Sequence, residues 1–276
     1  MENFRQFVKE YPAFTIFLVL ALGVVAVAVF APVIAPQDPY EAILANAVQP
    51  PGREHWFGTD KMGRDLFSRV LYGTRTSLAA SLALVAIVMA VGTLLGLLAG
   101  YFGGLVDGVI MRLSDMMISF PGMVLAIAVA GILGANMTNA VIALSLVSWS
   151  KYARLSRSLA LKIKSRDYMA AARLTGSKTS HILWSYLLPN ALPTMLVTGA
   201  TDIGSMMLEI AGLSFLGFGA QAPTAEWGLM LNEGRAYMTA APWLMVFPGL
   251  AIFMTVVVFN LLGDSLRDVL DPRCSK

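Results

Sequence analysis

The chain has 276 residues, of which 57 % are hydrophobic and only 13 % charged, and its formal net charge at pH 7 is +3. Soluble domains carry about 25 % charged residues, so the composition excludes a disordered chain, a nucleic-acid binder and an ordinary cytosolic enzyme. One cysteine and two histidines exclude a disulfide framework and leave little scope for a metal site, and we expect none. The composition predicts a protein embedded in membrane lipid.

Six stretches are predicted to cross the membrane, since a transmembrane helix needs about 20 mostly apolar residues. In chain order they are residues 13–34, 77–101, 116–133, 137–150, 191–219 and 243–263. The first is too long for the apolar part of a signal peptide, and no clear cleavage site follows it, so we interpret it as a retained anchor. The predicted fold class is all-α, a polytopic membrane protein with six transmembrane helices.

These spans divide the chain into three regions. Residues 1–35 form the N-terminal tail and anchor helix, and residues 36–76 form an extracytoplasmic segment. Residues 77–276 form the core domain, with a polar and basic cytoplasmic loop at residues 151–190.

The extracytoplasmic segment is predicted to contain an amphipathic helix over residues 64–75, which lies on the outer face and leads into the second span. Its apolar stripe at helical spacing consists of Leu66, Phe67, Val70 and Leu71. Asp65 and Arg69 are four residues apart and are expected to pair on this helix.

The distribution of cations predicts the orientation. With both termini in the cytoplasm, 14 of the 20 Lys and Arg residues lie on the cytoplasmic side and 6 outside. Cytoplasmic loops carry an excess of Lys and Arg, so both termini are predicted to be cytoplasmic. Five of the six outside cations lie in residues 36–76, against this trend.

A row of glycines at intervals of four marks the second span and its end. Gly92, Gly96 and Gly100 lie in the span, and Gly104 and Gly108 follow. Glycines at this spacing line one helix face and allow another backbone to approach closely. We favour packing within the chain; contact with a second membrane subunit is the alternative.

Two carboxylates lie in the fifth span. Asp202 and Glu209 are seven residues apart, almost two turns, so both face one way, with Met206 between them. Ionisable groups at membrane depth usually face a bundle interior or a wet cavity. We expect this face to line a pathway or a subunit interface; a satisfied structural pair near a helix end is the alternative.

The basic loop is predicted to hold two short helices. The first covers residues 167–175, with alanines at 170–172, and Gly176 suits the left-handed residue that ends it. The second covers residues 178–187 and is expected to stop at Pro189. The small alanines would allow a partner protein to pack closely against the first helix; an ordinary re-entry loop with interfacial helices is the alternative.

This loop lacks a nucleotide-binding signature. A phosphate-binding loop needs a Gly directly before its Lys and another five positions earlier. Here Ser177 precedes Lys178, and Ala172 holds the earlier position. We therefore expect no nucleotide hydrolysis on this chain.

The loop also resembles the EAA signature of ABC importer permeases, beginning at Tyr168. Aligned on Gly176, the residues that match the signature are Ala171, Ala172, Leu188 and Pro189. Ala170 and Tyr186 stand where the signature has Glu and Ile. The loss of that Glu is usual in the peptide and nickel branch of the family.

Four more blocks extend the resemblance along nearly the whole chain. They are Gly58–Arg69, Ala99–Gly104, Gly212–Gly217 and Asn260–Asp268 with Asp271-Pro272. The chain is similar to the C-type permease subunit of dipeptide, oligopeptide and nickel importers. Around Asp202–Gly234 it looks closest to the nickel permease.

The resemblance implies a mechanism and a set of partners. Two homologous permeases would form the pore in a bacterial inner membrane, two cytoplasmic ATPases would dock on them, and an external binding protein would deliver nickel, a nickel chelate or di- or oligopeptides. Mg-ATP would bind the ATPases, so this chain would hold no cofactor and catalyse no reaction. The residues implied in coupling are Tyr168, Ala170, Ala171, Ala172, Arg173, Gly176, Leu188 and Pro189.

Two other functions remain open from the residues alone. A stand-alone secondary transporter would normally show paired halves with broken helices, and the sequence shows no repeat. An intramembrane enzyme would need a catalytic constellation in its spans, where Asp202 and Glu209 are the only candidates.

Overall fold

The computed structural model describes residues 9–270, and the regular secondary structure in that range is helical, without a strand. The predicted all-α class is therefore confirmed. The terminal residues whose orientation the cation bias predicts, 1–8 and 271–276 with Cys274, lie outside the described range.

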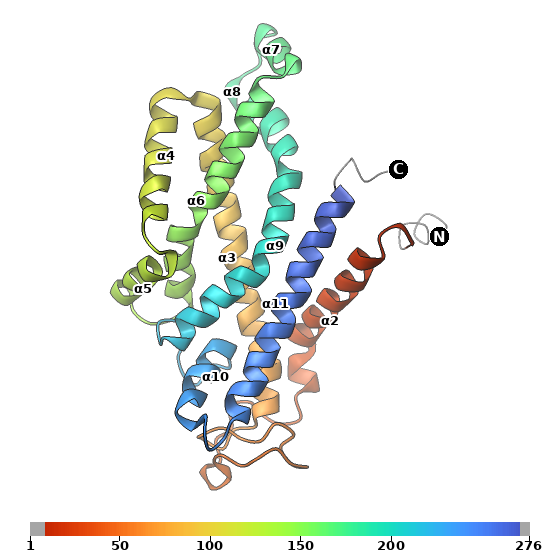
Figure 1. The fold of residues 1–276 in the computed structure, drawn as a ribbon, viewed down its shortest axis with the longest axis vertical. Coiled ribbons are helices and arrows are strands. Elements are labelled where there is room, and N and C mark those ends of the chain that lie inside the picture. The colour runs from red at the N-terminus through yellow and green to blue at the C-terminus, as the bar shows by residue number, and fades with distance from the viewer. Residues whose placement is uncertain (1–8, 271–276) are drawn as a thin grey trace.

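Ten α-helices make up most of the described chain (Figure 1). They are α2 (Pro12–Ile34), α3 (Leu66–Phe102), α4 (Gly104–Ser119), α5 (Gly122–Leu133), α6 (Met137–Lys164), α7 (Asp167–Leu174), α8 (Thr179–His181), α9 (Leu188–Phe215), α10 (Trp227–Gly234) and α11 (Trp243–Leu270). Three short turns of other helix types are Leu44–Asn46, Ile182–Leu187 and Arg235–Tyr237.

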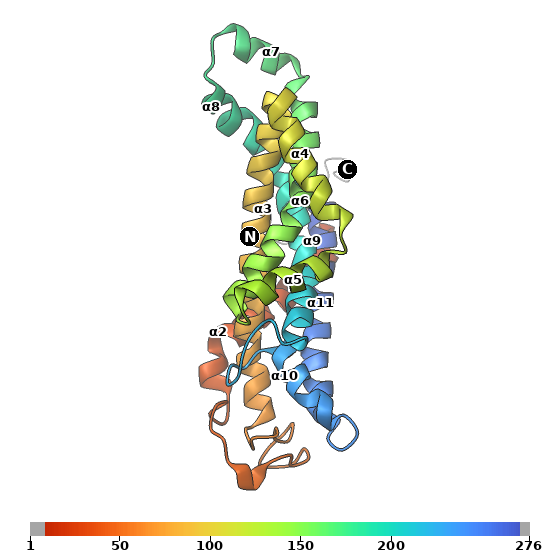
Figure 2. The ribbon, with the colours of Figure 1, turned by 90° about the vertical axis from the view of Figure 1, so that its left-hand side faces the viewer.

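The long helices lie along the long axis of the molecule, and each end of the bundle has its own short elements. Figure 2 shows α7 and α8 together at one end. The segment between α2 and α3 lies at the other end, where α10 is also found (Figure 1). The bundle therefore separates the basic loop from the segment predicted to be extracytoplasmic.

The predicted count of six spans is not confirmed. In residues 9–270, four helical runs are long and apolar enough to cross a membrane: α2, α3, Thr179–Phe215 and α11. The pair α4 and α5 makes a fifth only if it is taken as one span bent by 96°.

The predicted third span, residues 116–133, is broken in its first turns. α4 ends at Ser119, Phe120 has an extended backbone, and Pro121 is the N-cap of α5. Proline lacks an N–H and disfavours the helical conformation of the residue before it. The apolar composition of residues 116–133 does not indicate this break, because Pro121 lies inside the apolar run.

The predicted fourth span, residues 137–150, continues as α6 to Lys164. The basic second half of α6 contains neither Gly nor Pro, so nothing in its sequence ends the helix. It is held to α4 by two ion pairs, which join Arg154 to Asp115 and Arg157 to Asp107.

The helix predicted at residues 64–75 is present as the first turns of α3, continuous with the span that follows. Asp65 is its N-cap and accepts a hydrogen bond from the backbone N–H of Ser68 at 2.8 Å. The other carboxylate oxygen of Asp65 lies 3.0 Å from Nδ1 of His55. The expected pairing of Asp65 with Arg69 is therefore wrong.

The glycine row packs α3 against α6, as favoured from the sequence. A Cβ atom at Gly92 would lie 2.5 Å from the Trp149 carbonyl oxygen, and one at Gly100 would lie 2.6 Å from the Cβ of Ala160. A Cβ at Gly96 would overlap Ser156. Gly104 and Gly108 have no such neighbour within 4 Å. The first three glycines therefore serve contacts within this chain and not a second subunit.

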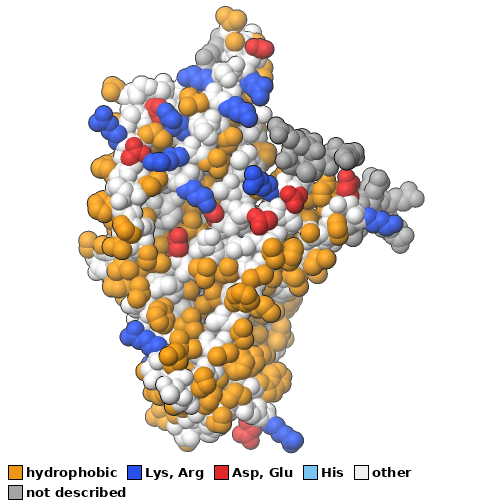
Figure 3. Space-filling view, viewed as in Figure 1, with side chains coloured by type: hydrophobic (Ala, Val, Ile, Leu, Met, Phe, Trp, Pro, Cys, Tyr) orange, Lys and Arg blue, Asp and Glu red, His pale blue; other side chains and the backbone are white. Residues whose placement is uncertain are grey.

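Charge is unevenly distributed over the surface. On the face shown in Figure 3, Lys, Arg, Asp and Glu gather toward the end that carries α4 and α7, and apolar side chains cover much of the rest. The apolar band is the surface expected to face lipid.

Candidate coupling loop and translocation cavity

The loop after α6 folds as a short helix with a glycine cap. α7 ends at Leu174, and Gly176 has a φ of +76°, as its predicted left-handed conformation requires. The backbone N–H of Ser177 donates to the Ala172 carbonyl oxygen at 3.1 Å, which is the long hydrogen bond of a Schellman motif. The helix end predicted at Gly176 is therefore confirmed.

α7 has one buried and one exposed face. Met169 packs into an apolar cluster with Ile163 and Leu187, and Ala172 is also buried. The exposed described side chains of α7 that could meet a partner include Tyr168, Ala170, Ala171 and Leu174. Ala172 therefore faces its own chain, unlike the other two alanines.

The second helix does not stop at Pro189, and this expectation is wrong. A helical run extends from Thr179 to Phe215, with a π-helical turn at Ile182–Leu187 just before the proline. Pro189 is the second residue of α9, inside this run, and has no backbone N–H to donate. Asn190 donates through its side-chain amide to the Tyr186 carbonyl oxygen at 2.6 Å. Leu188 is half-buried and Pro189 is exposed.

A cavity of about 340 Å³ lies where the corner between α4 and α5 meets α6 and α9. It brings together the three predicted pore residues of α9 and the break in the third span. Its lining residues are Met117, Ile118, Phe120, Gly122, Val147, Ser148, Ser150, Lys151, Asp202, Ser205, Met206 and Glu209.

Asp202 is held by α6. Nζ of Lys151 lies 2.7 Å and 2.8 Å from its two carboxylate oxygens, and the Tyr152 hydroxyl donates to it at 2.9 Å. A buried carboxylate needs such partners, because removing a charge from water is costly. The sequence does not reveal this partner, because Lys151 falls just after the predicted fourth span, in the basic loop.

Glu209 lies in the same cavity but is not paired in this way. It is half-buried, and no hydrogen bond or ion pair joins its carboxylate to any part of residues 9–270. Met206 is buried on the same face. The two carboxylates therefore share one direction, as their spacing predicts, but only Asp202 is neutralised.

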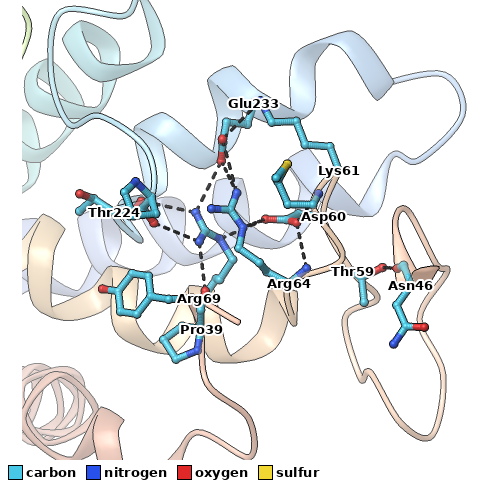
Figure 4. Close-up of polar contacts among 12 residues, drawn as sticks. Pro39, Asn46, Thr59, Asp60, Lys61, Arg64, Arg69, Thr224 and Glu233 are labelled. Carbon is cyan, nitrogen blue, oxygen red and sulfur yellow. Dashed lines mark hydrogen bonds and ion pairs between the residues drawn. The ribbon is translucent and has the colours of Figure 1, made fainter. Parts of the chain in front are cut away.

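A buried ion-pair cluster joins the segment before α3 to α10 at the opposite end (Figure 4). Nε of Arg64 donates to Asp60 at 2.6 Å, and its Nη2 lies 3.2 Å from Glu233. Arg69 lies 3.4 Å from Asp60 and 3.5 Å from Glu233. It also donates to three backbone carbonyl oxygens, those of Pro39, Pro223 and Thr224.

This cluster accounts for two of the five cations in residues 36–76. Arg64 and Arg69 are buried and neutralised, so they do not act as free surface charges. The sequence does not reveal the pairing with Glu233, because Glu233 lies 169 residues from Arg64. No local spacing signals such a pair.

Glu226 is a second residue at this end of the bundle whose role the sequence does not reveal. Its carboxylate accepts from the backbone N–H groups of Gly228 and Leu229 at 2.9 and 2.7 Å, and so caps α10. The Ser77 hydroxyl of α3 donates to it at 3.3 Å. Burial raises the pKa of Glu226, and these hydrogen bonds oppose that shift.

Comparison with known proteins identifies the class. The family model described as "Binding-protein-dependent transport system inner membrane component" matches residues 92–276. The glutathione transport system permease protein GsiD of Shigella flexneri serotype 5b is 48 % identical over 273 residues, 99 % of this chain and 90 % of that protein. The nickel transport system permease protein NikC of Escherichia coli K12 is 42 % identical over 237 residues, 86 % of each chain.

A third relative supports the same family, and a solved structure supports the fold. The dipeptide transport system permease protein DppC of Alkalihalophilus pseudofirmus is 41 % identical over 272 residues, 99 % of this chain and 89 % of that protein. A crystal structure described as an amino acid ABC transporter with histidines superposes with a TM-score of 0.56 at 17 % identity, covering 74 % of this chain and 95 % of that chain, which supports the fold alone. The chain therefore belongs to the family of binding-protein-dependent transport system inner membrane components, together with permease proteins of nickel, dipeptide and glutathione transport systems.

Proposed function

We propose that this chain is one of two homologous permease subunits of an ATP-driven importer. It contributes half of the translocation pore and takes no catalytic part. Two cytoplasmic ATPases bind and hydrolyse Mg-ATP, and an extracytoplasmic binding protein delivers the cargo. Family membership favours this function over a transporter that works alone and over an intramembrane enzyme.

The observation that carries the proposal is the link between α7 and the cavity. The exposed face of α7, with Tyr168, Ala170 and Ala171, would contact an ATPase. The helical run that starts at Thr179, after the Gly176 cap, continues into α9, which bears Asp202 and Glu209. A displacement of α7 would thus reach the cavity through a continuous helix.

Small peptides are the substrate class that we favour. The glutathione permease relative is 48 % identical to this chain over nearly its full length, whereas the nickel permease relative is 42 % identical over a shorter stretch. In residues 9–270, no group of three or more His, Cys, Asp and Glu side chains could hold a metal ion.

Co-purification and uptake test this function. The chain is extracted with its partners in mild detergent, the subunits are identified by mass spectrometry, and the complex is reconstituted in vesicles with its binding protein. We expect two ATPases and a second permease, and ATP-dependent uptake of labelled glutathione or a dipeptide. A chain that purifies alone and transports without ATP would contradict the proposal.

A further inference from the structure

The cavity between the α4–α5 corner, α6 and α9 has an excess of negative charge. Its charged lining residues are Lys151, Asp202 and Glu209. Lys151 and Asp202 neutralise each other through two short contacts. With two carboxylates and one ammonium group, the cavity has one carboxylate in excess, and no hydrogen bond or ion pair in residues 9–270 joins Glu209.

A second polar group in the same cavity also lacks a partner. Ser150 lines the cavity and is only 1 % exposed. Its hydroxyl has no hydrogen-bond partner among the described residues. A buried hydroxyl without a partner is costly unless something else satisfies it. Ser150 and Glu209 thus both carry unused hydrogen-bonding capacity beside this cavity, but the Ser150 hydroxyl is buried, and only the half-buried Glu209 carboxylate is open to a ligand.

Polar side chains continue from this cavity along one face of α9. A second cavity, of about 470 Å³, is lined by Thr194, Thr198 and Thr201 together with Asp264 and Arg267 of α11. At 100° per residue, the α9 hydroxyls of the two cavities, those of Thr194, Thr198, Thr201 and Ser205, fall with Glu209 in an arc of roughly 80°. Residues 194–209 span roughly 22 Å at 1.5 Å per residue.

We propose that this stripe is the path of the cargo and that Glu209 makes it selective for an organic ammonium group. The carboxylate accepts hydrogen bonds from the N–H donors of the ammonium group. One carboxylate among hydroxyls is a poor site for a transition metal, which prefers imidazole or thiolate. This inference rests on the proposed function, since it assigns the chemistry of the pore.

The electrostatic part of the proposal can be tested without knowing the cargo. Ser205 lines the cavity one turn before Glu209 and is exposed. In a Cys274→Ser background, Ser205→Cys places a reactive thiol there. Two thiol reagents of similar size, one bearing trimethylammonium and one bearing sulfonate, are reacted with the reconstituted complex, and labelling of this chain is followed by mass spectrometry.

We expect the cationic reagent to react faster relative to the anionic one. Adding Glu209→Gln should lower the ratio of the two rates by roughly tenfold, because a unit charge about 6 Å away acts in opposite directions on the two reagents. Glu54→Gln, which removes an exposed carboxylate from the distant segment before α3, is the matched control and should leave the ratio unchanged.

An unchanged ratio in the Glu209→Gln variant would overturn the inference, and so would a thiol that neither reagent reaches. ATP-driven uptake is also measured in vesicles that contain the Cys274→Ser, Ser205→Cys protein with Glu209 intact. Uptake together with an unchanged ratio would contradict this inference alone, whereas absence of ATP dependence would contradict the proposed function.

Discussion

Lys151 and Asp202 form an ion pair whose two members differ in their exposure. The Lys151 side chain is 58 % exposed, whereas that of Asp202 is only 8 % exposed. The pair joins α6 to α9 beside the cavity, and Tyr152 completes the hydrogen bonding of the carboxylate. Loss of Lys151 therefore leaves a buried carboxylate without its cation, whereas loss of the Asp202 carboxylate leaves an ammonium group that water can reach.

Lys151→Met should destabilise the protein more than Asp202→Asn. Without the ammonium group, a buried carboxylate keeps only Tyr152 as a partner, and we expect a loss of about 2–3 kcal/mol in the free energy of unfolding, below the usual cost for a fully buried pair because Lys151 is exposed. Without the carboxylate, Lys151 can reach water, and we expect a loss of about 1 kcal/mol. Unfolding in detergent measures both; a larger loss for Asp202→Asn would contradict this account.

The same substitution at two glycines should have opposite effects. Gly96→Ala places a methyl group against Ser156 and the backbone of Ala153, so overpacking should cost about 1–3 kcal/mol. Gly108→Ala in α4 meets no atom within 4 Å and improves helix propensity by about 1 kcal/mol or less. The midpoint of thermal unfolding measures both effects: we expect it to fall in Gly96→Ala and to rise slightly in Gly108→Ala. Equal midpoints would mean that α3 and α6 are not in close contact.

Glu226→Ala should release the N-terminus of α10. It removes the acceptor of two backbone N–H groups and should cost about 2 kcal/mol. Glu226→Gln keeps one acceptor oxygen and should cost less. Hydrogen exchange of residues 227–234 reports the effect locally, and equal protection in both variants would show that the cap is unimportant.

The cation bias predicts a cytoplasmic carboxyl terminus. In intact cells Cys274, the only cysteine, should react with membrane-permeant thiol reagents and not with impermeant ones. Gel-shift labelling of this chain measures both. Labelling by an impermeant reagent would reverse the predicted orientation.

Local signals predicted part of this structure well. The cap at Gly176 follows from one glycine after a short helix, and the shared direction of Asp202 and Glu209 follows from a spacing of seven residues. Both depend only on the geometry of one helix. The packing of Gly92, Gly96 and Gly100 against α6 was likewise favoured from the sequence.

The features that were missed depend on distant residues or on competing signals. The pairing of Arg64 with Glu233 and of Lys151 with Asp202 joins segments far apart in the chain. At Pro189, a π-helical turn allows the helix to continue where proline alone predicts a stop. These ion pairs and this helix continuation depend on tertiary packing, which a single sequence predicts only weakly.

We propose that α7 transmits the movement driven by ATP hydrolysis from the ATPases to the cavity. Ala171 is exposed, so Ala171→Glu should leave the fold intact while placing a charge where an ATPase would pack. Gly176 has a φ of +76°, so Gly176→Val should strain the cap between α7 and the helical run into α9. Ala171→Ser, which stays small, is the control.

The most direct measurement is ATP hydrolysis by the complex in reconstituted vesicles, with and without loaded binding protein, beside a pull-down of the ATPases. We predict that Ala171→Glu and Gly176→Val remain in the membrane and lose the stimulation by loaded binding protein, while Ala171→Ser keeps it. Normal stimulation and normal ATPase binding in both variants would contradict the account, because residues 167–189 would then not couple the ATPases to the pore.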